Sequence, residues 1–178
     1  MRRLKLSAAL VTLLAISVNS FSAIKTLNDG PVGDEWHNLQ VNEVNRLKLH
    51  TQFFAYESLQ KALTNNCKTS QNYLSLNGAW KFYFAETPNQ RPQKFYDPLF
   101  DDSSWNTLNV PGIWELNGYG DPVYLNVGFA WREHFRNNPP QVPVKDNHVG
   151  SYRRTITLPD NWNNKQVIAH FGSVTSNM

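Results

Sequence analysis

The chain has 178 residues, which suits one domain preceded by an export signal. Its formal net charge of +3 comes from 17 basic and 14 acidic residues, and three of the basic residues lie among the first five. The remainder is therefore balanced and has no basic stripe for nucleic acid or an anionic membrane surface. Its single cysteine, Cys67, excludes an internal disulfide, so an apolar core must stabilise the fold.

The first residues predict a secretory signal peptide. A basic head at residues 1–5 precedes an uncharged, mostly apolar run at 6–18, and small residues follow at Ser20 and Ser22. The run is shorter than the roughly 18 apolar residues of a membrane-spanning helix, although a buried helix or an uncleaved anchor is the alternative. We expect residues 1–22 to be removed by cleavage after Ser22 or Ala23. The mature protein is then periplasmic or extracellular, with no membrane attachment.

Residues 23–73 are predicted to form an N-terminal arm that lies across the following domain. The arm begins as a polar, turn-rich tether and then shows no clear hydrophobic period. The aromatic patch at residues 53–56 is expected to dock on a core, and residues 57–63 are expected to form a short helix.

From residue 74 onward the pattern predicts an all-β domain. Short apolar runs alternate with turns rich in Pro, Gly and Asn, and residues 100–105 read as a capped turn that carries a Trp anchor. The predicted strands are residues 80–84, 122–127, 150–158 and 166–171, the last of them buried. This order is typical of a β-sandwich or jelly roll, a fold that needs about eight strands. With about five strands visible, we expect residues 74–178 to be a sandwich that is incomplete at its C-terminus, and the chain to be a fragment.

No catalytic set is visible in the sequence. Glycoside cleavage needs two carboxylates close together, but the acids are scattered, and the adjacent Asp101 and Asp102 favour a capping role in a turn. Glu133 and His134 are neighbours without the spacing of a zinc site. Arg153 and Arg154 fall on opposite faces of a predicted strand, and we expect one of them to pair with an acid inside the sandwich.

A series of motifs in one order resembles the N-terminal sugar-binding domain of glycoside hydrolase family 2 β-galactosidases. The motifs are EW at 35–36, LSLNGAWKF at 74–82, FDDSSW at 100–105, VPGIWELNGYGDPVYLNV at 110–127, NPP at 138–140, VGSYRR at 149–154 and HFG at 170–172. Glucuronidases and mannosidases share the architecture, but the segments around Trp114 and Tyr124 are similar to the galactosidase branch.

The resemblance implies a galactose-binding-like jelly roll packed against immunoglobulin-like domains and a (β/α)8 barrel. In the family the barrel supplies two catalytic glutamates and, in many members, Mg²⁺ and Na⁺ sites, and the complete enzyme hydrolyses terminal non-reducing β-D-galactosides with retention. A homo-oligomer of the complete enzyme is also expected. This chain would then contain no catalytic residue, cofactor or metal site of its own, and would be inactive alone.

The resemblance also implies a sugar-binding role for Asn126, whose amide can both donate to and accept from a galactose hydroxyl. The alternative is that Asn126 ends a strand by bonding the backbone. Asp121, Trp114 and Tyr119 are weaker candidates at the same rim, and the two aromatic residues are expected chiefly to pack.

Two other functions remain open at this point. The chain could be a stand-alone carbohydrate-binding module without catalysis. It could also be a non-catalytic piece that docks on the rest of the enzyme as a separate chain.

Overall fold

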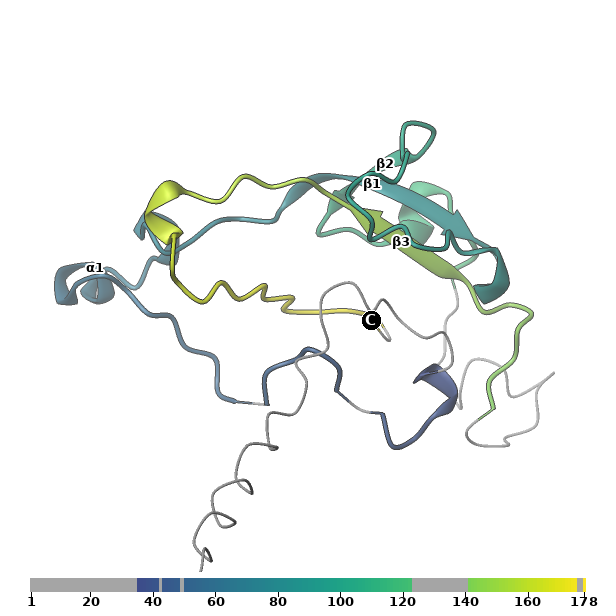
Figure 1. Cartoon of the computed structure of the whole chain (residues 1–178), viewed down its shortest axis with the longest axis horizontal. Helices are drawn as coiled ribbons and strands as arrows, with labels where there is room; N and C mark the ends of the chain where they lie inside the picture. Colours follow the sequence, from purple (N-terminus) through teal and green to yellow (C-terminus); the bar gives the residue numbers. More distant parts are fainter. Residues whose placement is uncertain (1–34, 42, 49, 123–140, 176–177) are drawn as a thin grey trace, which may run out of the picture.

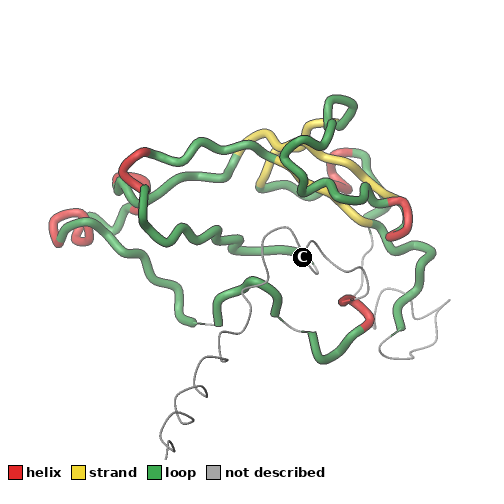
Figure 2. The backbone as a smooth tube through the Cα atoms, in the orientation of Figure 1, coloured by secondary structure: helices red, strands yellow, loops and turns green. Residues whose placement is uncertain are grey.

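The computed structural model describes residues 35–41, 43–48, 50–122, 141–175 and 178. Its elements, in chain order, are η1 Glu35–His37, α1 Leu59–Leu63, η2 Cys67–Thr69, β1 Gly78–Ala85, η3 Pro88–Gln90, β2 Asn106–Val110, η4 Trp114–Asn117, β3 Val149–Arg153 and η5 Asp160–Trp162. Long loops connect one small sheet and several short helices (Figure 1, Figure 2). This strand-dominated arrangement is consistent with a β-sandwich domain.

The sheet has three antiparallel strands in the order β2-β1-β3, with β1 in the centre. Trp80 of β1 lies opposite Leu108 of β2, and Phe82 lies opposite Tyr152 of β3. Because successive side chains of a strand point to opposite faces, Trp80, Phe82 and Phe84 share one face. The predicted strand at residues 80–84 is confirmed, with its side-chain alternation.

The core of the described residues is small. Its buried hydrophobic side chains are Phe82, Ala85, Trp105 and Leu108. Phe82 lies on one face of the sheet. Trp105 packs on the other face, with its ring 5.7 Å from that of Tyr83. The predicted Trp anchor of the 100–105 turn is therefore confirmed.

Arg153 connects β3 to the loop that carries this anchor. Its Nη1 forms an ion pair with Asp102 and also donates to the carbonyl oxygen of Phe100 at 3.0 Å, while Nη2 donates to that of Asp97 at 2.9 Å. The guanidinium also lies over the Phe100 ring, 5.5 Å from its centroid. The prediction that one of the two adjacent arginines pairs with an acid is confirmed. The expected turn role holds for Asp101, which accepts a hydrogen bond from the Ser103 N–H at 2.9 Å.

The arm is stabilised around α1 and the segment that precedes β1. Ser58 caps α1 by accepting a hydrogen bond from the Lys61 N–H, which places the predicted helix at Leu59–Leu63. The Ser70 hydroxyl donates to Glu57 at 2.6 Å, and this bond lowers the pKa of the Glu57 carboxyl. In the predicted aromatic patch, Phe54 packs on Tyr56 and Tyr73, and docking of the patch on a core stays a prediction.

Two strand predictions near the end of the chain are corrected by the structure. Residues 166–171 are neither a strand nor buried, since Ile168 is 56% exposed. β3 ends at Arg153, and residues 154–158 run beside 74–77 without a backbone ladder. Hydrophobic residues alone do not make a strand when no neighbouring strand of the described ranges pairs with them.

The remaining strands also differ from expectation. β2 was not predicted, because most of its residues are polar and only Leu108 is buried. The strand expected at 122–127 lies outside the described residues apart from Pro122. None of the described helices has the length and apolarity needed to cross a membrane.

Phe82 is the side chain on which the sheet's stability should depend most. We expect Phe82→Ala to reduce the free energy of unfolding by about 3–5 kcal/mol, because it removes a ring from a site that is 1% exposed. The matched control Leu99→Ala removes a side chain that is 92% exposed, and should change the value by less than about 0.5 kcal/mol. Urea unfolding, followed by tryptophan fluorescence, measures the free energy of unfolding of both variants. Equal losses would contradict the assignment of Phe82 to the core.

Candidate functional site

The candidate site is built on the loop at residues 111–122, which follows β2. A cis peptide bond between Val110 and Pro111 turns the chain at the end of β2. The loop then forms η4, and Gly118 ends this helix in the left-handed region with φ 85°, a conformation that glycine adopts without steric cost. The N–H of Tyr119 donates to the carbonyl oxygen of Trp114 at 3.2 Å, which closes the loop on itself.

Two rings of this loop pack on the apolar face of β1. The Trp114 ring lies 6.2 Å from that of Phe82 and 5.7 Å from that of Phe84. The Tyr119 ring lies 4.9 Å from Phe82, edge to face, and 5.6 Å from Phe84. We call these four residues the aromatic cluster. Edge-to-face and tilted pairs of this kind contribute about 0.5–1.5 kcal/mol each beyond their buried area, so the cluster fixes the loop to the sheet.

β3 makes close contact with the same loop through glycine. A Cβ atom on Gly150 would lie 2.4 Å from Cζ3 of Trp114, closer than any side chain tolerates. The Trp114 ring therefore rests directly on the β3 backbone. On the other side of the cluster, the His148 ring lies 5.1 Å from that of Phe84, so the residues on either side of the 123–140 segment pack on the same strand.

The structure brings together two of the four predicted site residues. Trp114 and Tyr119 lie side by side and half-buried in the aromatic cluster, which agrees with the expectation that they pack. Asp121 follows on the same loop and is exposed. Asn126 lies outside the described residues, as do Glu133 and His134.

Glu115 is a residue of this region that the sequence did not single out. Burial, and secondarily the charge of Glu115, raise the pKa of the Tyr152 hydroxyl. Tyr152 also packs on Phe82 at 4.8 Å between ring centroids. The acidic residue on η4 thus lies near the apolar face.

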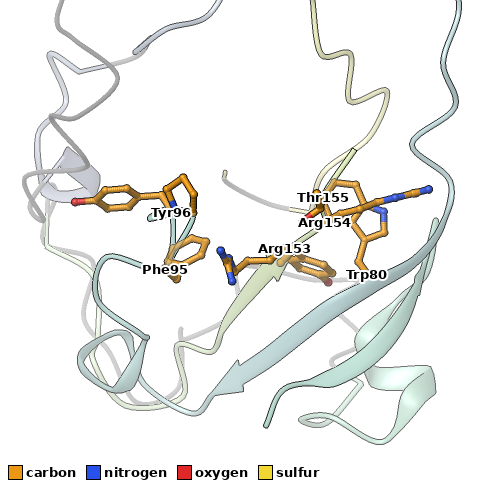
Figure 3. A pocket seen from close by; sticks show the side chains of 8 residues that line it. Trp80, Phe95, Tyr96, Arg153, Arg154 and Thr155 are labelled. Carbon is orange, nitrogen blue, oxygen red and sulfur yellow. The ribbon is translucent and has the colours of Figure 1, made fainter. Parts of the chain in front are cut away.

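A second feature is a concave surface over β1 and β3, with a volume of about 540 Å³ (Figure 3). It is lined by Trp80, Phe95, Tyr96, Pro98, Tyr152, Arg153, Arg154 and Thr155. Figure 3 shows Arg154 beside Trp80 at one end, whereas Arg153 points toward Phe95. None of the four predicted site residues lines this surface. The described ranges also contain no group of three or more His, Cys, Asp or Glu residues that could hold a metal ion.

Comparison with known proteins identifies the kind of domain. The family model described as glycosyl hydrolases family 2, sugar binding domain, matches residues 73–178. A β-galactosidase of Priestia megaterium is 39% identical over 143 residues, which are 80% of this chain and 14% of that protein. A β-galactosidase of Halalkalibacterium halodurans is 38% identical over 77% of this chain and 13% of its own length. The β-galactosidase large subunit of Leuconostoc lactis is 36% identical over 76% of this chain and 23% of its own length.

The contact between Trp114 and the β3 backbone can be tested with one methyl group. We expect Gly150→Ala to displace the Trp114 ring and to weaken the near-ultraviolet circular dichroism of the aromatic cluster. The matched control is Gly172→Ala, whose added Cβ would have its nearest neighbour at 3.7 Å, an ordinary contact. Identical spectra for Gly150→Ala and the unchanged chain would show that the ring does not rest on Gly150.

The raised pKa of Tyr152 predicts a loss of stability in alkali. The folded chain holds the hydroxyl neutral beyond its ordinary pKa of 10.0. The resulting stability is present below that pH and is lost as the pH rises through the higher pKa of the folded state. We expect Tyr152→Phe to lose less stability than the unchanged chain between pH 9 and about pH 11, the range around the ordinary tyrosine pKa. Urea titrations of both proteins at each pH measure this difference in stability. The same change in the free energy of unfolding with pH for both proteins would contradict the prediction.

Proposed function

The chain belongs to glycosyl hydrolases family 2 through its sugar-binding domain, and from this we propose that it is the N-terminal part of a β-galactosidase. The observation that carries the proposal is the 39% identity to a β-galactosidase over 80% of the chain. Because the chain spans about a seventh of the length of that relative, with 14% of it covered, the activity belongs to a longer polypeptide.

In this proposal the longer polypeptide hydrolyses terminal β-D-galactosides with retention of configuration. Its catalytic glutamates, and any Mg²⁺ or Na⁺ sites, lie in other domains. Retaining hydrolysis needs two carboxyl groups about 5–5.5 Å apart, and in this proposal both come from the other domains.

The domain described here contributes binding and not bond cleavage. We assign residues 1–22 to a signal peptide for export to the periplasm or the extracellular space, 23–73 to an arm, and 74–178 to a jelly-roll domain. Asn126 follows the loop at 111–122 in the sequence. We assign it to the galactosyl hydroxyls, with Asp121 as a second rim residue. Trp114 and Tyr119 support the rim by holding the loop on β1 through the aromatic cluster. Direct stacking of Trp114 or Tyr119 on sugar is a weaker part of the proposal.

Asn126 provides a direct test of the binding role. In the longer polypeptide we expect Asn126→Ala to raise KM for a nitrophenyl β-D-galactoside by about 5-fold, the effect of losing one neutral hydrogen bond of about 1 kcal/mol. Asn109→Ala is the matched control, since Asn109 is exposed on β2, and it should leave KM unchanged. Equal KM values for both variants and the unchanged enzyme would remove Asn126 from the substrate site.

The 178-residue chain by itself should not hydrolyse the galactoside. Purified chain is compared with a mock preparation, and with the longer polypeptide as the positive control. Hydrolysis by the chain well above the mock level would mean that catalytic groups are present within it, which contradicts the proposal.

A further inference from the structure

His148 lies directly before β3 and contacts the end of the loop at 111–122. Its ring is half-buried and lies 5.1 Å from the ring of Phe84, with 55° between the two planes. A Cβ atom on Gly120 would lie 3.0 Å from Nδ1 of His148 and 3.4 Å from Cζ of Phe84. Gly120 therefore rests against two rings, one from β1 and one from the residue that precedes β3.

The backbone around His148 is held on both sides. Val149, the first residue of β3, lies opposite Ala85 in the ladder with β1. Before His148, the side chain of Asn147 donates through Nδ2 to the carbonyl oxygen of Pro143 at 2.9 Å. These contacts leave the imidazole ring little freedom to move away from the loop.

The loop is equally constrained at the point of contact. Gly120 has a φ of 63°, in the left-handed region that residues with a side chain rarely adopt. The residue before it, Tyr119, is anchored in the aromatic cluster, and the residue after it, Asp121, is exposed. The contact with His148 thus lies between an anchored residue and a candidate rim residue.

We propose that His148 is a positioning residue for substrate binding, which acts by fixing Gly120 and with it the direction in which Asp121 is presented. This inference rests on the proposed function, because Asp121 is a rim residue only in the enzyme proposed above. A displacement of about 1 Å that begins far from the reacting atoms can cost about 100-fold in activity. A ring that limits movement of the rim therefore contributes to binding without touching the sugar.

Two other roles for His148 predict different behaviour. If the imidazole itself formed a hydrogen bond with the sugar, every apolar replacement would weaken binding. If the ring only stabilised the fold, its removal would lower the Tm and leave KM unchanged. A phenyl ring at position 148 separates these roles, because it keeps the flat shape and removes the polar atoms.

The test is steady-state kinetics of the longer polypeptide with a nitrophenyl β-D-galactoside. We expect His148→Ala to raise KM at least about 3-fold, while kcat changes by less than about 2-fold because a binding group is displaced. His148→Phe keeps a ring against Gly120 and should have a KM within about 2-fold of that of the unchanged enzyme. His170→Ala, at an exposed histidine, is the control and should leave KM unchanged.

Three results would overturn the proposal. An unchanged KM for His148→Ala, with a lowered Tm or without one, would leave His148 no part in binding. A KM that rises as much in His148→Phe as in His148→Ala would mean that the polar atoms of the imidazole act, and not its shape. A fall in kcat of the same factor as the rise in KM would place the effect on the reacting groups.

The route through Gly120 is tested by a double-mutant cycle. Gly118→Ala and Gly120→Ala both add a Cβ at positive φ, 85° and 63°, but at position 118 that Cβ would have no described atom within 4 Å. We expect Gly120→Ala to raise KM by a smaller factor in the His148→Ala background than in the unchanged enzyme, because contacting residues are coupled. Gly118→Ala should have the same effect in both backgrounds. Equal factors for Gly120→Ala in both would show that His148 does not act through Gly120.

Failure of this inference differs from failure of the proposed function. No hydrolysis of the galactoside by the unchanged longer polypeptide would refute the proposed function, and this role of His148 with it. Hydrolysis with a KM that His148→Ala leaves unchanged would refute the role of His148 alone.

Discussion

The packing of Trp114 and Tyr119 on Phe82 and Phe84 is the contact on which the rest of the domain depends. It ties the loop after β2 to the central strand, and Gly150 lets the same ring lie on β3. One aromatic cluster thus joins β1 and β3 to the candidate rim. This explains why a domain with so few buried hydrophobic residues still holds a loop of defined shape. In the proposed enzyme, the same packing holds the loop that precedes Asn126 in the sequence.

Two adjacent arginines point to opposite faces of the sheet and have different partners there. Arg153 points to the face where its own loop supplies Asp102, and it stabilises the domain from within. Arg154 points to the face where the described residues supply only backbone oxygens and the Trp80 ring. The two residues thus separate a half-buried ion pair within the domain from an exposed guanidinium that backbone oxygens hold.

Local patterns in the sequence predicted the parts of the fold that local chemistry determines. The alternation of Trp80, Phe82 and Phe84 identified β1, and the opposite faces of Arg153 and Arg154 predicted one internal ion pair. The polar strand β2 was missed because its pairing with β1, and not its hydrophobicity, makes it a strand. Residues 166–171 were assigned as a buried strand because they are apolar, but a strand also needs a neighbour to bond. Glu115 was overlooked because its proximity to Tyr152 arises only when η4 packs on the sheet.

Substrate preference of the longer polypeptide tests the central claim most directly. Its kcat/KM is measured with nitrophenyl β-D-galactoside, β-D-glucuronide and β-D-mannoside under one set of conditions. We expect the galactoside to be preferred by at least about 10-fold, a difference of about 1.4 kcal/mol in transition-state binding. A preference for the glucuronide or the mannoside, or no hydrolysis of any of the three, would contradict the assignment of this domain to a β-galactosidase.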